Sequence, residues 1–297
     1  MTWIRDIEKD EIRDGFLVTT DRKKLWNVEM ELLNFLKELC QQHGIRYFAI
    51  YGTLLGAVRH HGFIPWDDDI DVGMLRPDYN RFLRVAREAI KEPYFLQNMY
   101  SDRAIQFSKI RDSRTSAIEF PDCPLHQGIF IDIFPFDAGP DGSEEMDRIY
   151  TIQKELWMAV RAPEDVESGL VQGAVTQAGE DTLRRIIAMP LRERMDVFET
   201  FMEMQFEKSS KVGSFSRFMR EANVVFAADC FEESLDMPFE TTTLSVPIGY
   251  EDYLRGYFGN DYLQRKRYPT AHPDAVFSAD IPYEEYLAQI HDTSSEQ

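Results

Sequence analysis

Hydrophobic residues recur at three- and four-residue steps in several parts of the chain, and this spacing predicts amphipathic helices. We expect helices over residues 21–42, 76–90, 143–160, 190–208 and 249–258. The stretch 166–181 is rich in glycine and small residues and is predicted to be a loop. The last residues, 291–297, are expected to be disordered.

Short apolar or alternating runs between these helices predict strands. They cover residues 45–51, 69–74, 94–98, 104–112, 114–120, 128–134 and 239–247. The order is helix, strand, helix, strand and then several strands in succession. This order predicts an α/β (α+β) fold, in which a mixed sheet is flanked by helices and carries a helical insertion.

The change in pattern along the chain suggests three parts. Residues 1–140 are predicted to form a catalytic core, 141–225 a helical insertion, and 226–297 a C-terminal segment that completes the catalytic domain. The Met and Phe residues of the insertion are interpreted as the core of a helical subdomain. An acceptor-binding lid or a lipid-facing surface is the alternative.

Net charge, hydrophobicity and cysteine content indicate which partners and which cellular location to expect. The chain has 33 basic and 52 acidic residues, a net charge of −19, which argues against nucleic acid and against electrostatic binding to an anionic membrane. No apolar run is long enough for a transmembrane segment, and the charged start lacks a secretory signal. Three widely spaced cysteines favour a reducing, cytoplasmic location.

The most informative stretch is Tyr51–Met74, YGTLLGAVRHHGFIPWDDDIDVGM. Asp69 and Asp71 alternate with apolar residues, so in a strand their carboxylates share one face. Asp67 joins them if the strand starts early. Carboxylates crowded on one face repel each other, and a divalent cation such as Mg²⁺ relieves that repulsion. A solvated acidic loop is the alternative interpretation.

A further carboxylate, Asp132, lies inside the strongly apolar stretch 128–136. Leaving it buried without compensation would cost several kcal/mol. It is therefore expected to share a metal with Asp69 and Asp71, or to accept a proton from an acceptor hydroxyl. A structural pairing with an arginine or with backbone amides is the alternative.

This arrangement resembles the nucleotidyltransferase superfold, in which a Gly-Thr or Gly-Ser turn precedes Asp-x-Asp and a later third carboxylate. Within it, GTLLGAVRHHGFIPWDDDID resembles the signature of the LicD family of phosphocholine transferases, which includes the fukutin-type ribitol-phosphate transferases. Residues 107–115, 131–137 and 239–272 are similar to later segments of that family. Residues 141–225 show no such similarity.

The resemblance implies the transfer of a phospho-alcohol group, such as phosphocholine, from a CDP-linked alcohol donor to a hydroxyl of a glycan or lipid-linked glycan. It implies Mg²⁺ (or Mn²⁺) as cofactor and a cell-surface acceptor such as lipopolysaccharide or teichoic acid. Two alternatives stay open at this point. One is a nucleotidyltransferase that uses an NTP and releases pyrophosphate, and the other is a non-catalytic protein that binds nucleotide or glycan.

The resemblance also implies roles for the residues that match the family's motifs. We expect Asp69, Asp71 and Asp132 to be catalytic and to bind metal, with Asp67 as a further ligand. Gly52 allows close backbone approach, and the helix from Thr53 offers N–H groups to a donor phosphate. The remaining substrate-binding candidates are Arg59, Trp66, Lys109, Arg111 and His272, with Arg114 as another cation.

Lys109 and Arg111 are favoured among the cations, because they alternate with Ile110 on a predicted strand. Trp66 either lines the donor pocket or anchors the turn before the aspartates. His272 follows the predicted C-terminal helix, in a His-Pro loop.

Overall fold

The computed structural model describes residues 2–103, 105–215, 224–267 and 272–295. Its centre is a seven-stranded mixed sheet. The strands are β3 (Phe48–Ala49), β4 (Asp71–Leu75), β5 (Tyr94–Gln97), β6 (Ser108–Asp112), β8 (Ile129–Ala138), β9 (Lys211–Gly213) and β10 (Phe226–Ala227). β4 is parallel to β8, whereas the other pairs are antiparallel. The sheet and the helices around it confirm the predicted α/β (α+β) fold.

The longest strand, β8, joins most of the sheet. Residues 129–133 pair with β6, 132–136 pair with β4, and 137–138 pair with β9. All ten of its residues are buried, which is why its sequence is almost continuously apolar. Asp132 therefore lies near the middle of the sheet.

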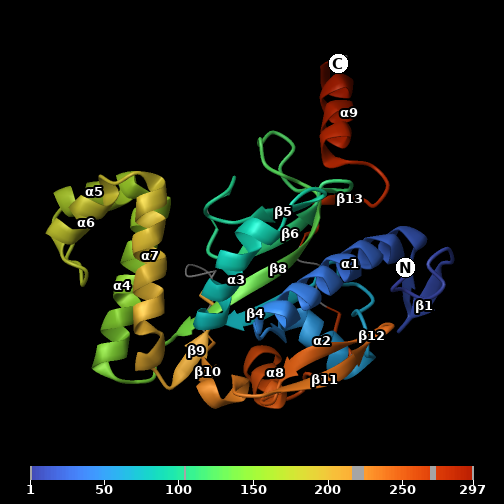
Figure 1. The fold of residues 1–297 in the computed structure, drawn as a ribbon, viewed down its shortest axis with the longest axis horizontal. Helices are drawn as coiled ribbons and strands as arrows, with labels where there is room; N and C mark the ends of the chain where they lie inside the picture. The colour runs from blue at the N-terminus through green and yellow to red at the C-terminus, as the bar shows by residue number, and fades with distance from the viewer. Residues whose placement is uncertain (1, 104, 216–223, 268–271, 296–297) are drawn as a thin grey trace.

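Four helices of the core position the strands. They are α1 (Thr20–His43), α2 (Tyr51–His60), α3 (Arg76–Ala89) and α8 (Tyr250–Phe258). The N-terminus of α1 is capped by Thr19, whose side chain accepts a hydrogen bond from the N–H of Arg22, and Gly44 ends the helix in a left-handed conformation. In Figure 1, α1 crosses the sheet, and α2 and α8 lie together at its lower edge.

A second group of helices projects from one side of the sheet (Figure 1, left). It consists of α4 (Glu144–Arg161), α5 (Pro163–Val171), α6 (Glu180–Ile187) and α7 (Leu191–Gln205), followed by the 3₁₀ helix η1 (Phe206–Lys208). These helices enclose a hydrophobic cluster of their own, which includes Leu156, Trp157 and Phe198. We call α4–α7 the helical unit. The predicted domain boundaries at 140 and 225 stay a prediction.

The predicted loop over 166–181 was wrong in part, because α5 continues to Val171 and α6 begins at Glu180. Pro163 suits the first turn of α5, and both helices carry acidic residues in their first turns, which stabilises their N-termini. Leu183 of α6 is buried. The residues that favour helix N-termini therefore allow two helices to form here, despite the glycine and other small residues in this stretch.

The C-terminal part also differs from expectation. The single strand predicted over 239–247 is a hairpin of β11 (Ser234–Phe239) and β12 (Thr242–Pro247), and η2 (Ala228–Phe231) precedes it. The expected disordered tail at 291–297 is largely part of α9 (Tyr283–Ser295), while residues 296–297 lie outside the described residues. The start of the predicted strand 104–112 includes residue 104, which is also outside them.

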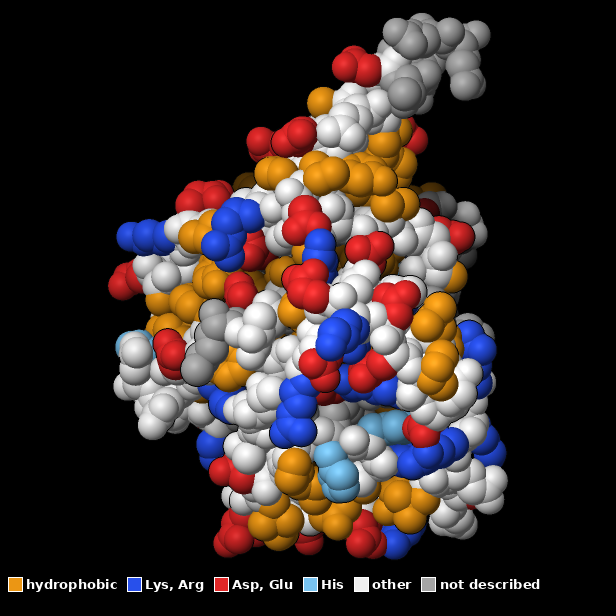
Figure 2. All heavy atoms as spheres, turned by 90° about the vertical axis from the view of Figure 1, so that its right-hand side faces the viewer, with side chains coloured by type: hydrophobic (Ala, Val, Ile, Leu, Met, Phe, Trp, Pro, Cys, Tyr) orange, Lys and Arg blue, Asp and Glu red, His pale blue; other side chains and the backbone are white. Residues whose placement is uncertain are grey.

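Two further pairs of strands complete the fold. β1 (Glu11–Arg13) pairs with β2 (Phe16–Val18), and β7 (Ser116–Ile118) pairs with β13 (Val276–Ser278). The second pair brings the C-terminal segment back to the core. Figure 2 shows acidic and basic side chains mixed on the face that includes the N-terminal hairpin, so the excess negative charge does not form one continuous area there.

Candidate active site

Three charged side chains form a row across neighbouring strands. Asp71 opens β4, and parallel pairing places it beside Asp132 of β8. Antiparallel pairing places Lys109 of β6 on the other side of Asp132. Residues opposite each other in a sheet point to the same face. Lys109 Nζ accordingly lies 2.7 Å from Oδ1 and 3.0 Å from Oδ2 of Asp132.

Backbone hydrogen bonds hold the start of β4 in place. The N–H of Asp71 donates to Thr53 Oγ1 at 2.8 Å, and the N–H of Ile50 donates to the carbonyl of Asp71 at 3.2 Å. The N–H of Asp132 donates to the carbonyl of Ile70 at 2.9 Å. Thr53, predicted as a phosphate contact, is thus buried and positions Asp71.

The segment before β4 differs from the predicted strand. β4 begins at Asp71, and residues 67–70 are irregular, so alternation does not set the directions of their side chains. Arg22 and Trp26 of α1 hold this turn by donating hydrogen bonds to the carbonyl of Asp67, at 2.9 and 3.1 Å. The first helix therefore has a direct role in shaping the site.

Gly52 and Asp67 are in close contact. A Cβ on Gly52 would overlap Oδ2 of Asp67, so glycine is required here by the carboxylate itself. Burial, followed by the charge of Asp68, raises the pKa of Asp67 to about 6. The predicted candidates Gly52 and Asp67 do belong to one cluster.

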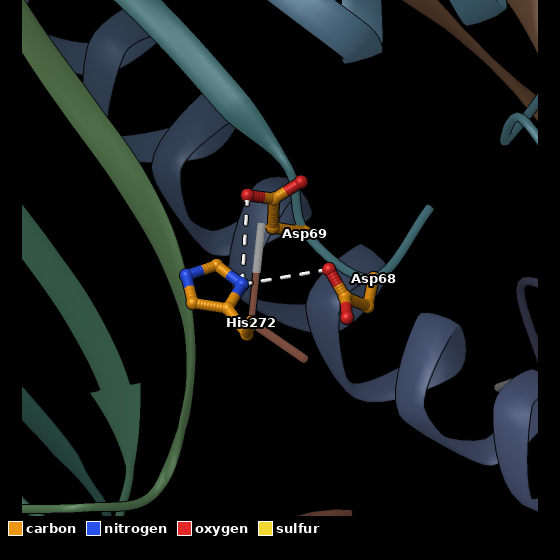
Figure 3. Close-up of side chains that lie close together, drawn as sticks. All are labelled: Asp68, Asp69 and His272. Atoms are coloured by element: carbon orange, nitrogen blue, oxygen red, sulfur yellow. Dashed lines mark hydrogen bonds and ion pairs between the residues drawn. The ribbon is translucent and has the colours of Figure 1, made fainter. Parts of the chain in front are cut away.

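Asp68, Asp69 and His272 form a second group in the same turn (Figure 3). His272 Nδ1 lies 3.4 Å from Asp68 Oδ1 and 3.9 Å from Asp69 Oδ2. The interaction with the two carboxylates raises the pKa of His272 against the effect of burial, which lowers it. His272 was a candidate from the sequence, but Asp68 was not, because the expected alternation turned it to the other face.

Glu29 is the other residue that the sequence analysis missed. It lies on α1, is 1% exposed, and its Oε2 has no hydrogen-bond partner among the described residues. Burial and then the charges of Asp69 and Asp68 raise its pKa well above the usual value for glutamate. A glutamate within the buried stripe of an amphipathic helix is the signal that could have identified it.

The site therefore concentrates negative charge away from water. Burial raises the pKa of Asp69, and the charge of Asp67 adds to the effect. Burial, then Asp69 and Asp132, raise the pKa of Asp71. The carboxyl groups that interact here are those of Glu29, Asp67, Asp68, Asp69, Asp71 and Asp132. The basic groups facing them are Lys109, Arg22 and His272. Such an excess of buried carboxyl groups suits a divalent cation with oxygen ligands.

The predicted cations have different surroundings. Lys109 Nζ lies over the ring of Phe130, 3.4 Å from its centroid, and burial lowers its pKa. Arg111 donates to the side chain of Gln97 at 2.7 Å and to the carbonyl of Gly128 at 2.8 Å, and it pairs with Glu119 at 3.3 Å. Lys109 faces the carboxylate row, whereas Arg111 is bound to protein groups beside it.

Arg59 and Arg114 are not in the row. Arg59 donates to the carbonyls of Tyr262 and Gln264, at 3.2 and 2.8 Å, and so holds the C-terminal segment. Arg114 pairs with Asp112 at 2.6 Å, and its side chain is largely exposed. The structure therefore gives both arginines protein partners outside the acidic cluster.

Trp66 lines a cavity of about 320 Å³ next to the acidic turn. The other lining residues are Asp14, Gly15, Phe16, Arg265 and Arg267. Arg267 lies over the ring of Phe16 at 4.7 Å, and Phe16 contacts Trp66 edge-on. An aromatic and basic cavity one residue from Asp67 could accommodate an organic group attached to phosphate.

No helix in the described ranges combines the length and the apolar character needed to cross a membrane.

Comparisons with known proteins show which sequences this chain resembles. Residues 44–167 match the family described as LicD/FKTN/FKRP, nucleotidyltransferase domain. The lipopolysaccharide cholinephosphotransferase LicD of Haemophilus influenzae is 25% identical over 239 residues, which cover 79% of this chain and 88% of that protein. The ribitol 5-phosphate transferase FKRP of Homo sapiens is 40% identical over 48 residues, 16% of this chain and 10% of that protein.

The mixed sheet carries its row of carboxylates beside Gly52 and Thr53 of α2, and the named relatives support a transferase. The matches confirm the resemblance found in the sequence. The chain is a LicD-like transferase, and its residues 44–167 match the nucleotidyltransferase domain of the LicD family.

Proposed function

We propose that this protein transfers a phospho-alcohol group from a CDP-linked donor to a hydroxyl of a glycan. Transfer of such groups is supported at the level of the family, because the named relatives are a cholinephosphotransferase and a ribitol 5-phosphate transferase. The relative that matches most of the chain is named for lipopolysaccharide. We therefore propose phosphocholine as the first donor group to test and a lipopolysaccharide-type glycan as the first acceptor.

The row of Lys109, Asp132 and Asp71 is the observation that carries this proposal. It puts two carboxylates and an ammonium group on one face of the sheet, and Asp69 lies two residues before Asp71 in the preceding turn. Phosphoryl transfer requires charge neutralisation and positioning more than covalent chemistry by the protein. This row supplies both kinds of charge at fixed positions.

Asp69, Asp71 and Asp132 would hold Mg²⁺ (or Mn²⁺), with Asp67 as a further ligand. Their oxygens fit such an ion, because Asp71 and Asp132 lie side by side on β4 and β8 and burial raises the pKa of Asp67, Asp69 and Asp71. A divalent ion would supply neutralisation of the charge on the donor phosphates.

The protein groups would perform the remaining tasks. The N-terminus of α2 at Gly52 would bind donor phosphate through its N–H groups, and Lys109 would hold Asp132 in place and offset phosphate charge. A bond would form between the acceptor oxygen and the phosphorus nearest the alcohol, and the bond from that phosphorus to CMP would break. The hydroxyl proton would pass to Asp132 if this carboxylate acts as the base and does not complete the metal site. The aromatic cavity at Trp66 would take the organic part of a substrate.

We also propose that the protein acts in the cytoplasm. All three cysteines, Cys40, Cys123 and Cys230, are free thiols, which is the form that a reducing compartment favours.

Product analysis tests the proposed function. Purified protein would be incubated with Mg²⁺, lipopolysaccharide and either CDP-choline, CDP-ribitol or CDP-glycerol, and CMP would be measured. We expect release of CMP, and a loss of about 1,000-fold in Asp71→Asn and Asp132→Asn with the fold retained. Asp122→Asn, an exposed aspartate, is the matched control.

Other outcomes lead to other functions. Near-normal turnover in either variant would exclude the assigned carboxylates. Release of pyrophosphate from CTP would favour a nucleotidyltransferase. Calorimetric binding of a CDP-alcohol without turnover would favour a non-catalytic binding protein.

A further inference from the structure

The group of Asp68, Asp69 and His272 has the composition of a metal site. Each residue offers one ligand atom, and these three atoms lie within 4.8 Å of one another. Figure 3 shows both carboxylates on the turn before β4 and the imidazole on the C-terminal segment, with Nδ1 facing the two carboxylates. Its distances to them, 3.4 and 3.9 Å, can be spanned by one ion with bonds of about 2.1 Å.

The imidazole is held in this orientation by the core. The ring of His272 meets Phe130 of β8 edge-on, with centroids 5.3 Å apart. The side chain of Asp68 is 1% exposed and that of His272 is 14% exposed. A buried group of this kind is pre-organised in a way that an exposed acidic loop is not.

A second observation comes from Glu29 of α1. Glu29 is fully buried, its Oε2 has no hydrogen-bond partner among the described residues, and it interacts electrostatically with Asp69 and Asp68. Among the described residues, Arg22 contacts this group, and its Nη1 lies 3.8 Å from Asp68 Oδ2. A buried carboxylate oxygen without a partner, such as Oε2 of Glu29, is costly, so a divalent ion bound nearby would stabilise this part of the structure.

We propose that Asp68, Asp69 and His272 form a second cation position, which takes a divalent transition-metal ion such as Mn²⁺. It is separate from the position proposed at Asp71 and Asp132, although Asp69 lies between the two. Mg²⁺ prefers oxygen ligands, whereas imidazole nitrogen suits transition metals. The inference goes beyond the proposed transfer reaction and can be tested without it.

Electron paramagnetic resonance of bound Mn²⁺ gives a direct test. The metal-free full-length protein would be titrated with Mn²⁺, and the number of bound ions would be counted from the loss of the free-ion signal. Pulsed measurements would then detect ¹⁴N coupling from a coordinated imidazole. We expect two bound ions and a ¹⁴N signal from one of them.

Variants separate the two positions. His272→Gln should abolish the ¹⁴N signal and weaken one ion about tenfold or more, and Asp68→Asn should weaken the same ion. Asp132→Asn should weaken the other ion and keep the ¹⁴N signal. His43→Gln, at the exposed end of α1, is the matched control and should change neither. Circular dichroism would verify that each variant is folded.

Three results would overturn the proposal. They are the absence of ¹⁴N coupling in wild-type protein, unchanged Mn²⁺ binding in His272→Gln, and loss of the ¹⁴N signal in Asp132→Asn. In the first two, His272 would act only as a charged partner of Asp68. In the third, a single ion would account for the whole site. A protein that fails to transfer phosphocholine could still give the expected spectra, so the two proposals fail independently.

Discussion

At the scale of single residues, the site requires a glycine at position 52 as well as its charged side chains. Gly52 leaves the space that the carboxylate of Asp67 occupies. Asp67 in turn belongs to the turn that carries Asp68 and Asp69. A methyl group at position 52 therefore acts on the acidic cluster without removing any charged group.

We predict that Gly52→Ala displaces Asp67 and lowers activity about tenfold or more, while the fold loses about 1–3 kcal/mol. CMP release and urea unfolding would measure the two effects. Gly169→Ala in α5 is the control, because its Cβ would meet Ala174 at an ordinary 3.7 Å. Equal activity in both variants would contradict the close contact.

His126 provides a pH-dependent contribution at the same scale. It stacks on Phe95 with centroids 4.6 Å apart, and its Nδ1 accepts a hydrogen bond from the N–H of Gly128 at 3.3 Å. Burial, then Arg111, lower its pKa from 6.5 to about 4. The unfolded chain therefore binds this proton at a higher pH than the folded protein does.

We predict that this contribution is complete above pH 6.5 and is lost as the pH falls from 6.5 towards 4. The free energy of unfolding should decrease by about 2 kcal/mol between neutral pH and about pH 5 through this group. Urea titrations of wild-type protein and His126→Gln would show it as a difference in slope against pH. A His43→Gln variant should follow the wild type, and parallel curves for all three proteins would refute the prediction.

The sequence alone could identify part of the site at this scale. Asp71 and Asp132 were predictable because each belongs to an apolar strand, where a carboxylate stands out. Asp68 and Glu29 were not, because their directions depend on an irregular turn and on how α1 packs against it. The partners of Arg59 and Arg111 come from segments far away in sequence, which local pattern does not specify.

At the scale of elements, a buried arginine connects the helical unit to the sheet. Arg76, at the start of α3, donates two hydrogen bonds to Asp137 of β8, at 2.5 and 2.7 Å, and one to Glu199 of α7. All three residues are buried. Breaking one partner of a buried ion pair leaves an uncompensated charge.

We predict that Glu199→Gln destabilises the protein by about 2–4 kcal/mol and loosens α7 from the sheet. Hydrogen exchange should increase in α7 and α4 more than in β4 and β8. Glu203→Gln, on an exposed part of the same helix, is the control. Uniform exchange across both regions would show that the contact does not couple them.

Most elements with a strong period were predictable, including α1, α3, α4 and β8. The errors have a common cause, since short elements depend on their partners. β13 pairs with β7, which lies far away in sequence, and β11 is recognisable as a strand only through its partner β12. α9 and α6 were missed because polar or small residues conceal the few apolar positions that define them.

At the scale of the whole molecule, the chain has two main hydrophobic cores. One surrounds the mixed sheet, and the other lies mainly inside the helical unit around Trp157 and also includes Met99 from the segment after β5. Separate cores allow one part to loosen while the other stays folded. The arrangement of the helical unit beside the sheet (Figure 1) is consistent with such independence.

We predict that Trp157→Ala costs the helical unit about 3–5 kcal/mol and leaves the sheet protected. Hydrogen exchange should rise across α4–α7 and stay low in β6 and β8. Val175→Ala is the control, because Val175 is 94% exposed. A single cooperative loss of protection in both regions would mean that the two cores unfold as one.

The contact between the C-terminal segment and the core has a consequence for folding during synthesis on the ribosome. The acidic turn emerges early, but its imidazole neighbour, His272, follows about two hundred residues later. Until then the nascent chain holds the carboxylates of Asp68 and Asp69 without that neighbour. The turn is therefore completed late in synthesis, after the strands on either side of it can already have paired.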